Sequence, residues 1–436
     1  MKVLKFGGTS VGSATRMKEV AELVCNGQQN IVVLSAMSGT TNSLVEIANY
    51  LYKQNHEGAN ELISKLEQKY YGEVDSLYST DEYKQKGKEL IEYHFDYIKS
   101  FTIDMFTAFE EKAILAQGEL ISTAMFHYFL EESGTKSTLL SALDFMRIDK
   151  QNEPDLPYIK ENTVKTLKEK EGFDIYVTQG YICRNAFGEI DNLQRGGSDY
   201  TASLIGAAIS SDEIQIWTDI DGMHNNDPRF VEKTHSIANL SYDEAAELAY
   251  FGAKILHPTC VLPAKIGGIP VRLLNTMEPK SPGTLISAKQ EKNRITAIAA
   301  KDNITAIKIK SGRMLLAYGF LRKVFEIFET YKTPIDMITT SEVGVSVTID
   351  EDKHLNDIVD DLKKFGTVDV DTKQVIICVV GDLIAETKGY ADKIFNALNN
   401  IPIRMISYGG SNYNVSILID EKYKKEALNV LNDNLF

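Results

Sequence analysis

The first twelve residues constrain the fold more than any other stretch of the chain. An apolar run at 3–6 holds one lysine, Lys5, and passes directly into a segment of glycine and hydroxyl residues at 7–12, before a helical pattern begins near Thr15. A strand, a glycine turn and a helix start can cradle phosphate, because backbone N–H groups approach an anion only where side chains are absent. Ser13 stands where a Walker A motif requires lysine. The segment therefore predicts an anion site of another design, the alternative being an ordinary strand-to-helix turn.

Two later loops have the same character. Residues 35–42 and 195–199 are rich in glycine and hydroxyl groups, and each follows a predicted strand. Strands and helices alternate to about residue 290, which is typical of an open, mostly parallel α/β sheet with helices on both faces. Loops at the carboxyl ends of such strands converge on one edge, where ligands bind. We therefore expect Lys5 and Arg195 to meet there, with Lys254 as a further candidate, in a site for a substrate with several negative charges.

A long helical region separates the second loop from the third. Residues 43–130 read as helical almost throughout, with polar breaks near 56–60 and 72–81. Glu119 follows Gly118 within an apolar part of this region. A lone carboxylate in such a stretch is usually paired or reaches the surface, so Glu119 by itself says little about function.

The composition restricts the class of function. With 436 residues, of which 43% are hydrophobic and 25% charged, the chain has ample core for roughly two to four domains. The net charge of −14 argues against nucleic acid or an anionic membrane surface as the main partner, but not against ATP in a local basic pocket. Four scattered cysteines argue against a zinc site or a disulfide framework. With no signal peptide or membrane-spanning run in the sequence, we expect a cytoplasmic protein.

The chain after residue 290 contains an internal repeat. The pattern Pro-Ile-x-Met-Ile occurs at 334–338 and again at 402–406, and Ser-x-x-Ile-Asp occurs at 346–350 and 416–420. Each copy is a β/α unit of roughly 65 residues, which is small for an independent core. The repeat therefore predicts a paired regulatory module.

Taken together, these segments resemble the aspartokinases. The resemblance covers essentially the whole chain and implies an amino-acid kinase fold followed by two ferredoxin-like ACT units. The domains implied are a catalytic domain at 1–290, a first ACT unit at 291–370 and a second at 371–436, with the two ACT units interleaved. The motifs that carry the resemblance, in order, are Lys5-Phe-Gly-Gly-Thr-Ser-Val11, Ser35-Ala-Met-Ser-Gly-Thr-Thr-Asn42, Gly118-Glu119, Arg195-Gly-Gly-Ser-Asp199, Trp217-Thr-Asp219, Asp227-Pro-Arg229 and Phe251-Gly-Ala-Lys254.

The resemblance implies a reaction. It is the phosphorylation of the side-chain carboxylate of L-aspartate by ATP with Mg²⁺, which gives 4-phospho-L-aspartate on the route to lysine, methionine and threonine. A carboxylate is ionised at neutral pH and needs no general base, so a catalytic histidine motif is not expected. Two alternatives stay open: another amino-acid kinase, such as a glutamate 5-kinase, and an amino-acid sensor without turnover.

The family's residue roles carry over onto matching positions. Lys5, Asp199 and Arg195 are implied as catalytic. Substrate contacts are implied for Ser35, Thr41, Glu119, Arg195 and Ser198, with Glu119 taking the ammonium and Arg195 the α-carboxylate of aspartate. No protein metal ligands are implied. The loop before Asp227 departs from the family, because it reads Met223-His224-Asn225-Asn226 where Tyr and Thr are common, and this leaves the adenine and ribose contacts open. The nucleotide contacts implied are Lys5, Gly7, Gly8, Thr9, Ser10, Thr218, Asp219, His224, Asp227, Arg229 and Lys254.

The first repeat also matches the lysine-binding positions of lysine-sensitive aspartokinases. The resemblance implies feedback inhibition by an amino acid, with L-lysine favoured over threonine, and assembly into a homodimer or homotetramer through the ACT units. Acidic side chains there would pair with the ligand's ammonium groups, and glycine-turn N–H groups would bind its carboxylate. The positions are Met314, Gly319, Phe320, Leu321, Asp336, Thr340, Ser341 and Glu342.

Overall fold

The chain forms two compact units. The computed structural model describes residues 1–103, 105–193, 196–252, 256–289, 294–311, 318–382, 386 and 388–436. The first unit comprises Met1–Met223, Ala238–Tyr242 and Ile255–Ala288, and the second comprises His224–Ile237, Asp243–Lys254 and Lys289–Phe436. Two segments that precede residue 290 thus pack with the C-terminal repeat.

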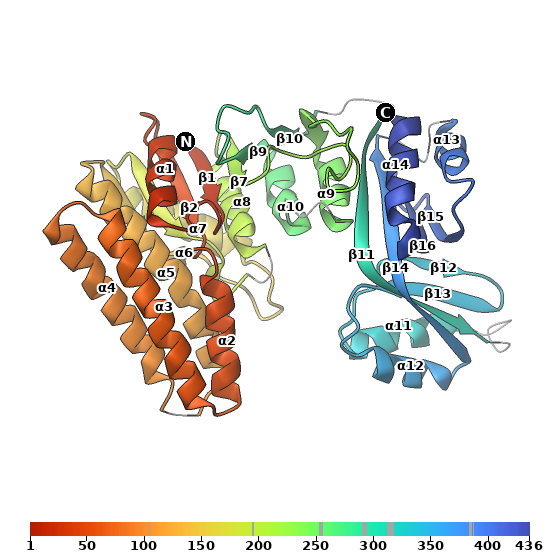
Figure 1. The fold of residues 1–436 in the computed structure, drawn as a ribbon, viewed down its shortest axis with the longest axis horizontal. Helices are drawn as coiled ribbons and strands as arrows, with labels where there is room; N and C mark the ends of the chain where they lie inside the picture. Colours follow the sequence, from red (N-terminus) through yellow and green to blue (C-terminus); the bar gives the residue numbers. More distant parts are fainter. Residues whose placement is uncertain are drawn as a thin grey trace. The chain divides into compact units, whose positions relative to one another are not determined.

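A mostly parallel sheet forms the centre of the first unit (Figure 1). Among the described residues it has eight strands in the order β3-β4-β2-β1-β7-β9-β10-β8, and only β10 pairs with β9 in the antiparallel sense. Lys5 lies opposite Val33 of β2 and Ile216 of β7, so these three central strands end at one edge. The predicted open α/β sheet is confirmed. The strands are β1 Lys2–Phe6, β2 Asn30–Leu34, β3 Ser137–Leu140, β4 Ile175–Gln179, β7 Ile214–Thr218, β8 Asn239–Ser241, β9 Val271–Asn275 and β10 Thr284–Ser287, with β5 Ile182–Arg184 and β6 Ile190–Asn192 as a separate pair.

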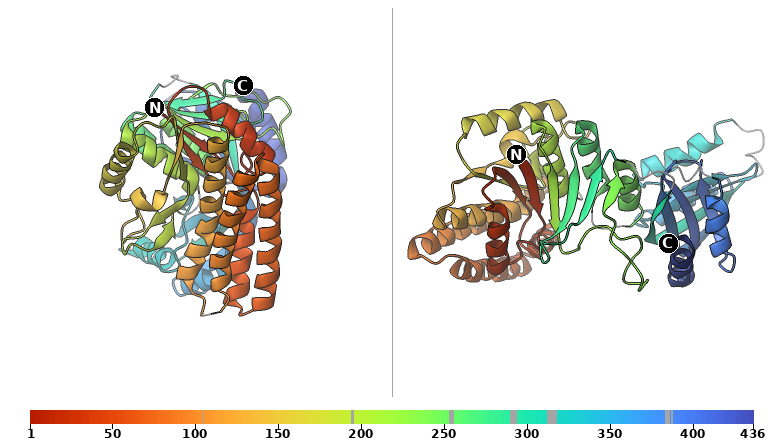
Figure 2. Two further views of the ribbon diagram at one scale, coloured as in Figure 1. Left: turned by 90° about the vertical axis from the view of Figure 1, so that its left-hand side faces the viewer. Right: turned by 90° about the horizontal axis from the view of Figure 1, so that it is seen from above.

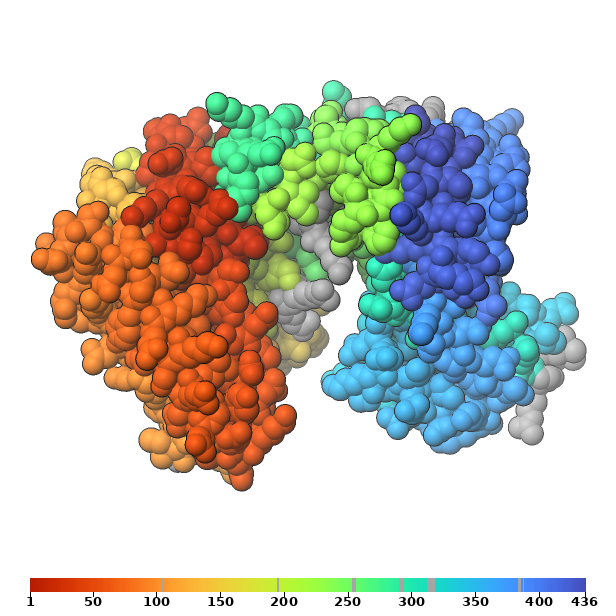
Figure 3. All heavy atoms as spheres, in the orientation of Figure 1, coloured from red at the N-terminus to blue at the C-terminus, as the bar shows by residue number. Residues whose placement is uncertain are grey.

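Four long helices pack against one another in this unit, and the left view of Figure 2 shows them side by side. They are α2 Thr40–Tyr52, α3 His56–Leu77, α4 Asp81–Ser100 and α5 Ala108–Glu132, and the atoms of α3 and α4 form much of the face of this unit that Figure 3 shows. One core cluster joins their apolar residues to those of β1 and β2. The other helices are α1 Ala14–Val24, α6 Ala142–Phe145, α7 Leu156–Glu169, α8 Gly197–Ile209 and α10 Pro258–Gly267.

The prediction of helix across residues 101–107 was wrong. Helix α4 ends at Ser100, and α5 starts only at Ala108. The apolar residues Phe101 and Phe106 continue the helical pattern through the gap, because both are packed against the core from a loop. Thr107 caps α5 in a capping box with Glu110, a start signal that the sequence does contain.

The second unit is built on one six-stranded sheet in which the two repeats share long strands. The order is β12-β13-β11-β14-β16-β15. Residues 305–310 of β11 pair with β13 on one side and with the first part of β14 on the other, and residues 295–301 pair with 376–381 of β14. Each half therefore has the βαββαβ order of a ferredoxin-like unit, and the second takes its last strand from the start of β11. The elements are β11 Ile295–Lys310, α11 Phe320–Thr330, β12 Ile338–Thr340, β13 Gly344–Ile349, α12 Leu355–Lys363, β14 Thr367–Gly381, α13 Tyr390–Ala397, β15 Ile403–Tyr408, β16 Asn414–Asp420, the 3-10 turn η1 Glu421–Tyr423 and α14 Lys424–Leu435, with α9 Tyr242–Tyr250 packing here from Asp243 onward.

Within the described part of the chain, no helix is both long and apolar enough to cross a membrane.

Candidate active site

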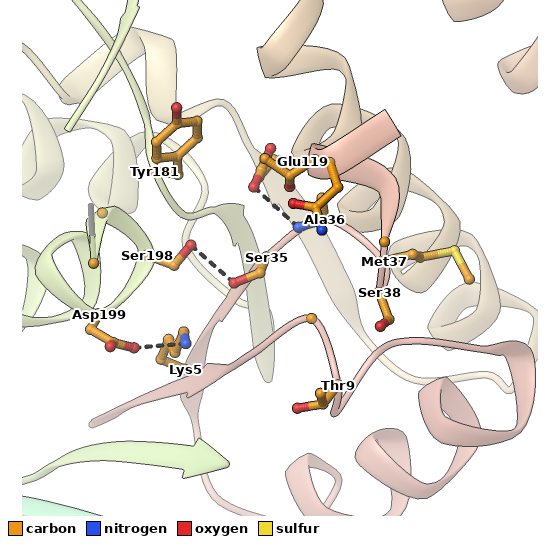
Figure 4. Close-up of a pocket in the computed structure, with 16 residues that line it drawn as sticks. Lys5, Thr9, Ser35, Ala36, Met37, Ser38, Glu119, Tyr181, Ser198 and Asp199 are labelled. Atoms are coloured by element: carbon orange, nitrogen blue, oxygen red, sulfur yellow. Dashed lines mark hydrogen bonds and ion pairs between the residues drawn. The ribbon is translucent and has the colours of Figure 1, made fainter. Parts of the chain in front are cut away.

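The three glycine-rich loops meet around one pocket of the first unit. Its volume is about 630 Å³, and residues of segments 5–9, 35–42 and 196–199 line it together with Glu119 and Tyr181 (Figure 4). These segments follow the carboxyl ends of β1 and β2 or begin α8, and the parallel register of β1 with β2 brings the first two to the same edge. The convergence expected from the sequence is therefore present.

Two helices start at this pocket without a side-chain cap. Gly39 precedes α2 and Gly196 precedes α8, with φ of 80° and 75°, and neither N-cap has a side-chain hydrogen bond. A φ in this range favours glycine. The first N–H groups of an α-helix have no partner within the helix and carry partial positive charge. Both helix starts can thus bind anionic oxygens in the pocket.

Lys5 supplies a full positive charge between them. Its Nζ lies 2.7 Å from Oδ1 of Asp199, in the first turn of α8, and both side chains are largely buried. The ammonium lies close to Gly7, since a Cβ there would be in van der Waals contact with Lys5 Nζ, at 3.4 Å. The pair fixes the ammonium at the mouth of the anion-binding loops.

Glu119 presents an unsatisfied carboxylate oxygen. Its side chain is only 3% exposed; Oε1 accepts the N–H of Ala36 at 3.2 Å, and Oε2 has no hydrogen-bond partner among the described residues. Burial raises the pKa of Glu119 from 4.5 to about 8, although the Ala36 N–H opposes this. A buried acceptor without a partner is costly, so a ligand cation here would stabilise the carboxylate.

Small residues let α5 bring Glu119 to the loop. A Cβ on Gly118 would lie 2.8 Å from the Cβ of Ala36, a separation that real side chains avoid. Ser122 also holds the loop, because its hydroxyl donates to the Ser35 carbonyl at 2.8 Å. The Ser35 hydroxyl in turn donates to that of Ser198 at 3.0 Å and joins the second loop to the third (Figure 4).

Some of the other residues expected to bind substrate or nucleotide line this pocket, and others lie elsewhere in the structure. Thr41, Gly8 and Thr9 line the pocket. Ser10 does not line it, since its buried hydroxyl bonds that of Thr276 at 2.7 Å. Thr218 and Asp219 follow one another at the carboxyl end of β7, where the Thr218 hydroxyl donates to Asp219 at 3.1 Å. Arg195 and Lys254 lie outside the described residues.

Three expected nucleotide contacts belong to the second unit. Asp227 and Arg229 form a bidentate ion pair, in which the arginine Nε lies 2.9 Å from Oδ1 and NH2 lies 2.6 Å from Oδ2. The backbone of His224 forms an isolated antiparallel β-bridge with that of Ser236. The residues that depart from the family pattern have a structural role here. Asn225 and Asn226 are buried and donate to Oδ1 of Asn432 in α14.

Tyr181 is the pocket residue that the sequence did not single out. It follows β4 with φ of 69°, a left-handed conformation that a bulky residue seldom adopts, and its N–H donates to the Thr201 hydroxyl at 3.0 Å. The residue before it must be small, because a Cβ on Gly180 would lie 2.5 Å from that of Ser198. Gly180 beside a strand end was the available signal.

The expected effector residues lie in the first repeat of the second unit. Gly319, with φ of 82°, precedes α11 without a side-chain cap, so the N–H groups near Phe320 and Leu321 are placed to meet an anion. The side chain of Asp336 is 1% exposed. Thr340, Ser341 and Glu342 are exposed at the end of β12, and Met314 lies outside the described residues.

Asp336 has one engaged and one open oxygen. Lys301 Nζ lies 2.5 Å from Oδ1, and the Tyr250 hydroxyl donates to the same atom at 2.9 Å. Oδ2 is buried and has no partner among the described residues. Lys301 Nζ also forms an ion pair with Asp350, whose Oδ2 lies 2.9 Å away.

Comparison with known proteins places the chain in a family. The Amino acid kinase family pattern matches residues 1–275, and an ACT domain pattern matches 377–435. Aspartokinase 2, chloroplastic, of Arabidopsis thaliana is 33% identical over 464 residues, covering 100% of this chain and 84% of the relative. Lysine-sensitive aspartokinase 3 of Escherichia coli strain K12 is 30% identical over 447 residues, covering 100% and 99%.

Solved structures of an aspartokinase also match this chain along its whole length. The complex of E. coli aspartokinase III with aspartate and ADP (R-state) has a TM-score of 0.87 at 30% identity, with 100% of both chains covered. The complex of the same enzyme with lysine and aspartate (T-state) has a TM-score of 0.83 at 31% identity, covering 100% of this chain and 99% of the other. Because the kinase pattern spans more than half of the chain and aspartokinases match it along its whole length, the chain belongs to the amino acid kinase family and, within it, to the aspartokinases.

Proposed function

We propose that this chain transfers the γ-phosphoryl group of ATP to the side-chain carboxylate of L-aspartate. The observation that carries the proposal is the open Oε2 of buried Glu119, within the same pocket as Lys5 and two uncapped helix starts. A small zwitterion with a further carboxylate satisfies these groups together, with its ammonium at Glu119 and its anionic oxygens toward the loops.

The chain's own residues have little covalent work in this reaction. The attacking carboxylate is already ionised, so alignment and charge neutralisation account for most of the rate. Lys5 meets the charge that spreads over the transferring oxygens, and Asp199 holds the lysine in place. The helix starts at Gly39 and Gly196 add fixed dipoles that need no rearrangement during the transfer.

Magnesium accompanies ATP in this proposal. Among the described residues, no group of three or more His, Cys, Asp or Glu side chains is arranged to hold a metal ion. Mg²⁺ keeps several waters and binds through phosphates and one or two carboxylates, so the proposal needs no larger cluster of protein ligands. Asp219, at the end of β7, is the carboxylate that would hold it. When bound, the ion neutralises charge on the phosphates.

Turnover of aspartate against glutamate tests the proposal. We expect ADP release to depend on aspartate and to be at least about tenfold slower, in kcat/KM, with glutamate, because one extra methylene displaces the nucleophile from a fixed ammonium site. Preference for glutamate would support a glutamate 5-kinase instead. Absence of turnover with either acid would support a sensor.

We further propose that L-lysine inhibits the enzyme at the first repeat. The open oxygen of buried Asp336 can accept an ammonium group of lysine, and the uncapped N–H groups at the start of α11 can bind the carboxylate of lysine. In the second Pro-Ile-x-Met-Ile pattern the position of Asp336 is taken by Arg404, which pairs with Asp371. An effector with a cationic side chain therefore fits the first repeat better than the second. Assembly through the ACT units as a homodimer or homotetramer is a companion proposal.

Asp336→Asn is expected to raise the inhibition constant for lysine by about 30-fold or more, since truncating one partner of a buried charge pair costs about 2–5 kcal/mol. Inhibition curves of aspartate turnover measure this. Asp350→Asn is the matched control, because Asp350 also binds Lys301 but is more exposed and lies outside the expected effector positions. Unchanged lysine inhibition in Asp336→Asn would remove Asp336 from the site, and inhibition by threonine alone would change the effector.

A further inference from the structure

One face of α3 contacts the chain segments that carry the first two glycine-rich loops, 7–12 and 35–42. Glu73 is four residues from Lys69 and three from Tyr70, so it neighbours both of them on the helix surface. Lys69 Nζ donates to the Ser38 carbonyl at 2.8 Å, and the Tyr70 hydroxyl shares a hydrogen bond of 2.8 Å with the hydroxyl of Thr40. Oε2 of Glu73 accepts the N–H of Ala14, the first residue of α1, at 2.7 Å. The helix thus binds Ser38 and Thr40 of the loop 35–42 and the start of α1, which follows the loop 7–12.

These two loops also touch each other. A Cβ on Gly12 would lie 3.0 Å from the Cβ of Ser38, and one on Gly8 would lie 3.0 Å from the Ala36 carbonyl oxygen. Packing this tight passes a displacement of one loop to the other. Since Gly39 provides no side-chain cap, the start of α2 depends on bonds from neighbouring elements for its position.

Tyr70 is the central member of this face. Its side chain has 0% exposure, its ring packs 5.8 Å from that of Phe95, and burial raises its pKa, so the hydroxyl stays neutral. Thr40, its partner, is 1% exposed and is the first residue of α2. A hydrogen bond between two buried groups fixes geometry closely, because breaking it leaves both groups unsatisfied.

We propose that Tyr70 is a positioning residue for phosphoryl transfer, which acts through Thr40 to set the start of α2 against the pocket, with Lys69 and Glu73 supporting the same arrangement. Tyr70 is not among the residues that line the pocket, and its proposed role rests on the kinase function proposed above. Because phosphoryl transfer depends on alignment, a small shift of the helix start lowers the rate without unfolding the protein.

The test compares two tyrosine variants of the full chain. Tyr70→Phe removes only the hydroxyl that binds Thr40. Tyr78→Phe is the matched control, because Tyr78 is 2% exposed and its hydroxyl donates to the Met125 carbonyl at 2.9 Å, away from both loops. We expect similar losses of melting temperature in both variants. The kcat with aspartate and ATP should fall by about tenfold in Tyr70→Phe only, which corresponds to the loss of one positioning bond.

A double-mutant cycle adds a second readout. Thr40→Val removes the partner hydroxyl at nearly constant shape, so Thr40→Val and Tyr70→Phe should lower kcat to a similar degree, and the double variant should be no slower than either. Equal kcat in Tyr70→Phe and Tyr78→Phe, or fully additive effects in the cycle, would overturn the positioning role. Lack of turnover in the unmodified protein would instead overturn the kinase function, so the two failures are distinguishable.

Discussion

Lys5→Ala is expected to lower the kcat of aspartate phosphorylation by at least about 10²-fold, the usual effect of removing one preorganised charge from a transition state. Lys5 is a cation that the structure places beside the anion-binding loops, and its loss also leaves Asp199 without its ion-pair partner, 2.7 Å away. The added negative charge repels phosphate, so the KM for ATP should rise as well. Steady-state ADP release at saturating aspartate measures both constants.

Lys2→Ala is the control for this variant. Lys2 lies on the same strand, β1, but at its other end, where Nζ is 3.8 Å from Glu213. A surface pair of this kind contributes little, so kcat should stay within about twofold of the unmodified protein. Near-normal kcat in Lys5→Ala would remove Lys5 from the mechanism.

Glu119→Gln is expected to raise the KM for aspartate by about 10²-fold, because an amide cannot neutralise the substrate ammonium in a buried site. The variant should also change the pH dependence. With a pKa of about 8 in the free protein, Glu119 is mostly protonated at neutral pH and must release a proton to bind an ammonium. The KM for aspartate of the unmodified protein should therefore fall as pH rises from about 7 toward 8.

The stability of the free protein should fall over the same pH range in which aspartate binding improves. Because the folded pKa of Glu119 lies above its usual 4.5, the folded state binds more protons than the unfolded state between these values. The contribution of Glu119 to the free energy of unfolding is therefore greatest below about pH 4.5 and is lost as pH rises toward 8. Glu119→Gln should remove this slope, which denaturant titrations at pH 6 and 8 can measure.

Glu111→Gln is the control on the same helix. Glu111 accepts the Tyr52 hydroxyl at 2.8 Å in an exposed place, so neither the KM nor its pH dependence should change. An unchanged KM for aspartate in Glu119→Gln would show that another group binds the ammonium.

Much of the candidate active site could be predicted because its parts are local patterns. Each glycine loop follows a strand directly, and a parallel sheet brings such loops to one edge. The place of Lys5 beside the loops therefore follows from its position on the strand that leads into the first of them. Glu119 needed the family resemblance, since its surroundings in the sequence are only apolar, and its isolation arises from the packing of α5 against Ala36.

Other features depend on contacts that local patterns do not encode. Asn225 is buried against Asn432, 207 residues away, and no signal in either segment indicates this. The interleaving of the two repeats was expected only from the family resemblance, and the repeat pattern of strand, helix and strand missed the second helix of each, α12 and α14. The sharing of strands between the repeats depends on which distant strands pair with each other. The hydrophobic periodicity of each strand does not determine its partner.

The shared strand β11 has a consequence for biosynthesis. Its first half, 295–301, is made before the rest of the first repeat, yet it pairs with 376–381 of β14, which in turn pairs with β16 near the end of the chain. While the ribosome is still making the intervening residues, this half-strand is an unpaired edge, which can recruit other chains. Nascent chains stalled near residue 370 should therefore aggregate or need a chaperone, whereas release of the full chain lets the edge pair within its own sheet.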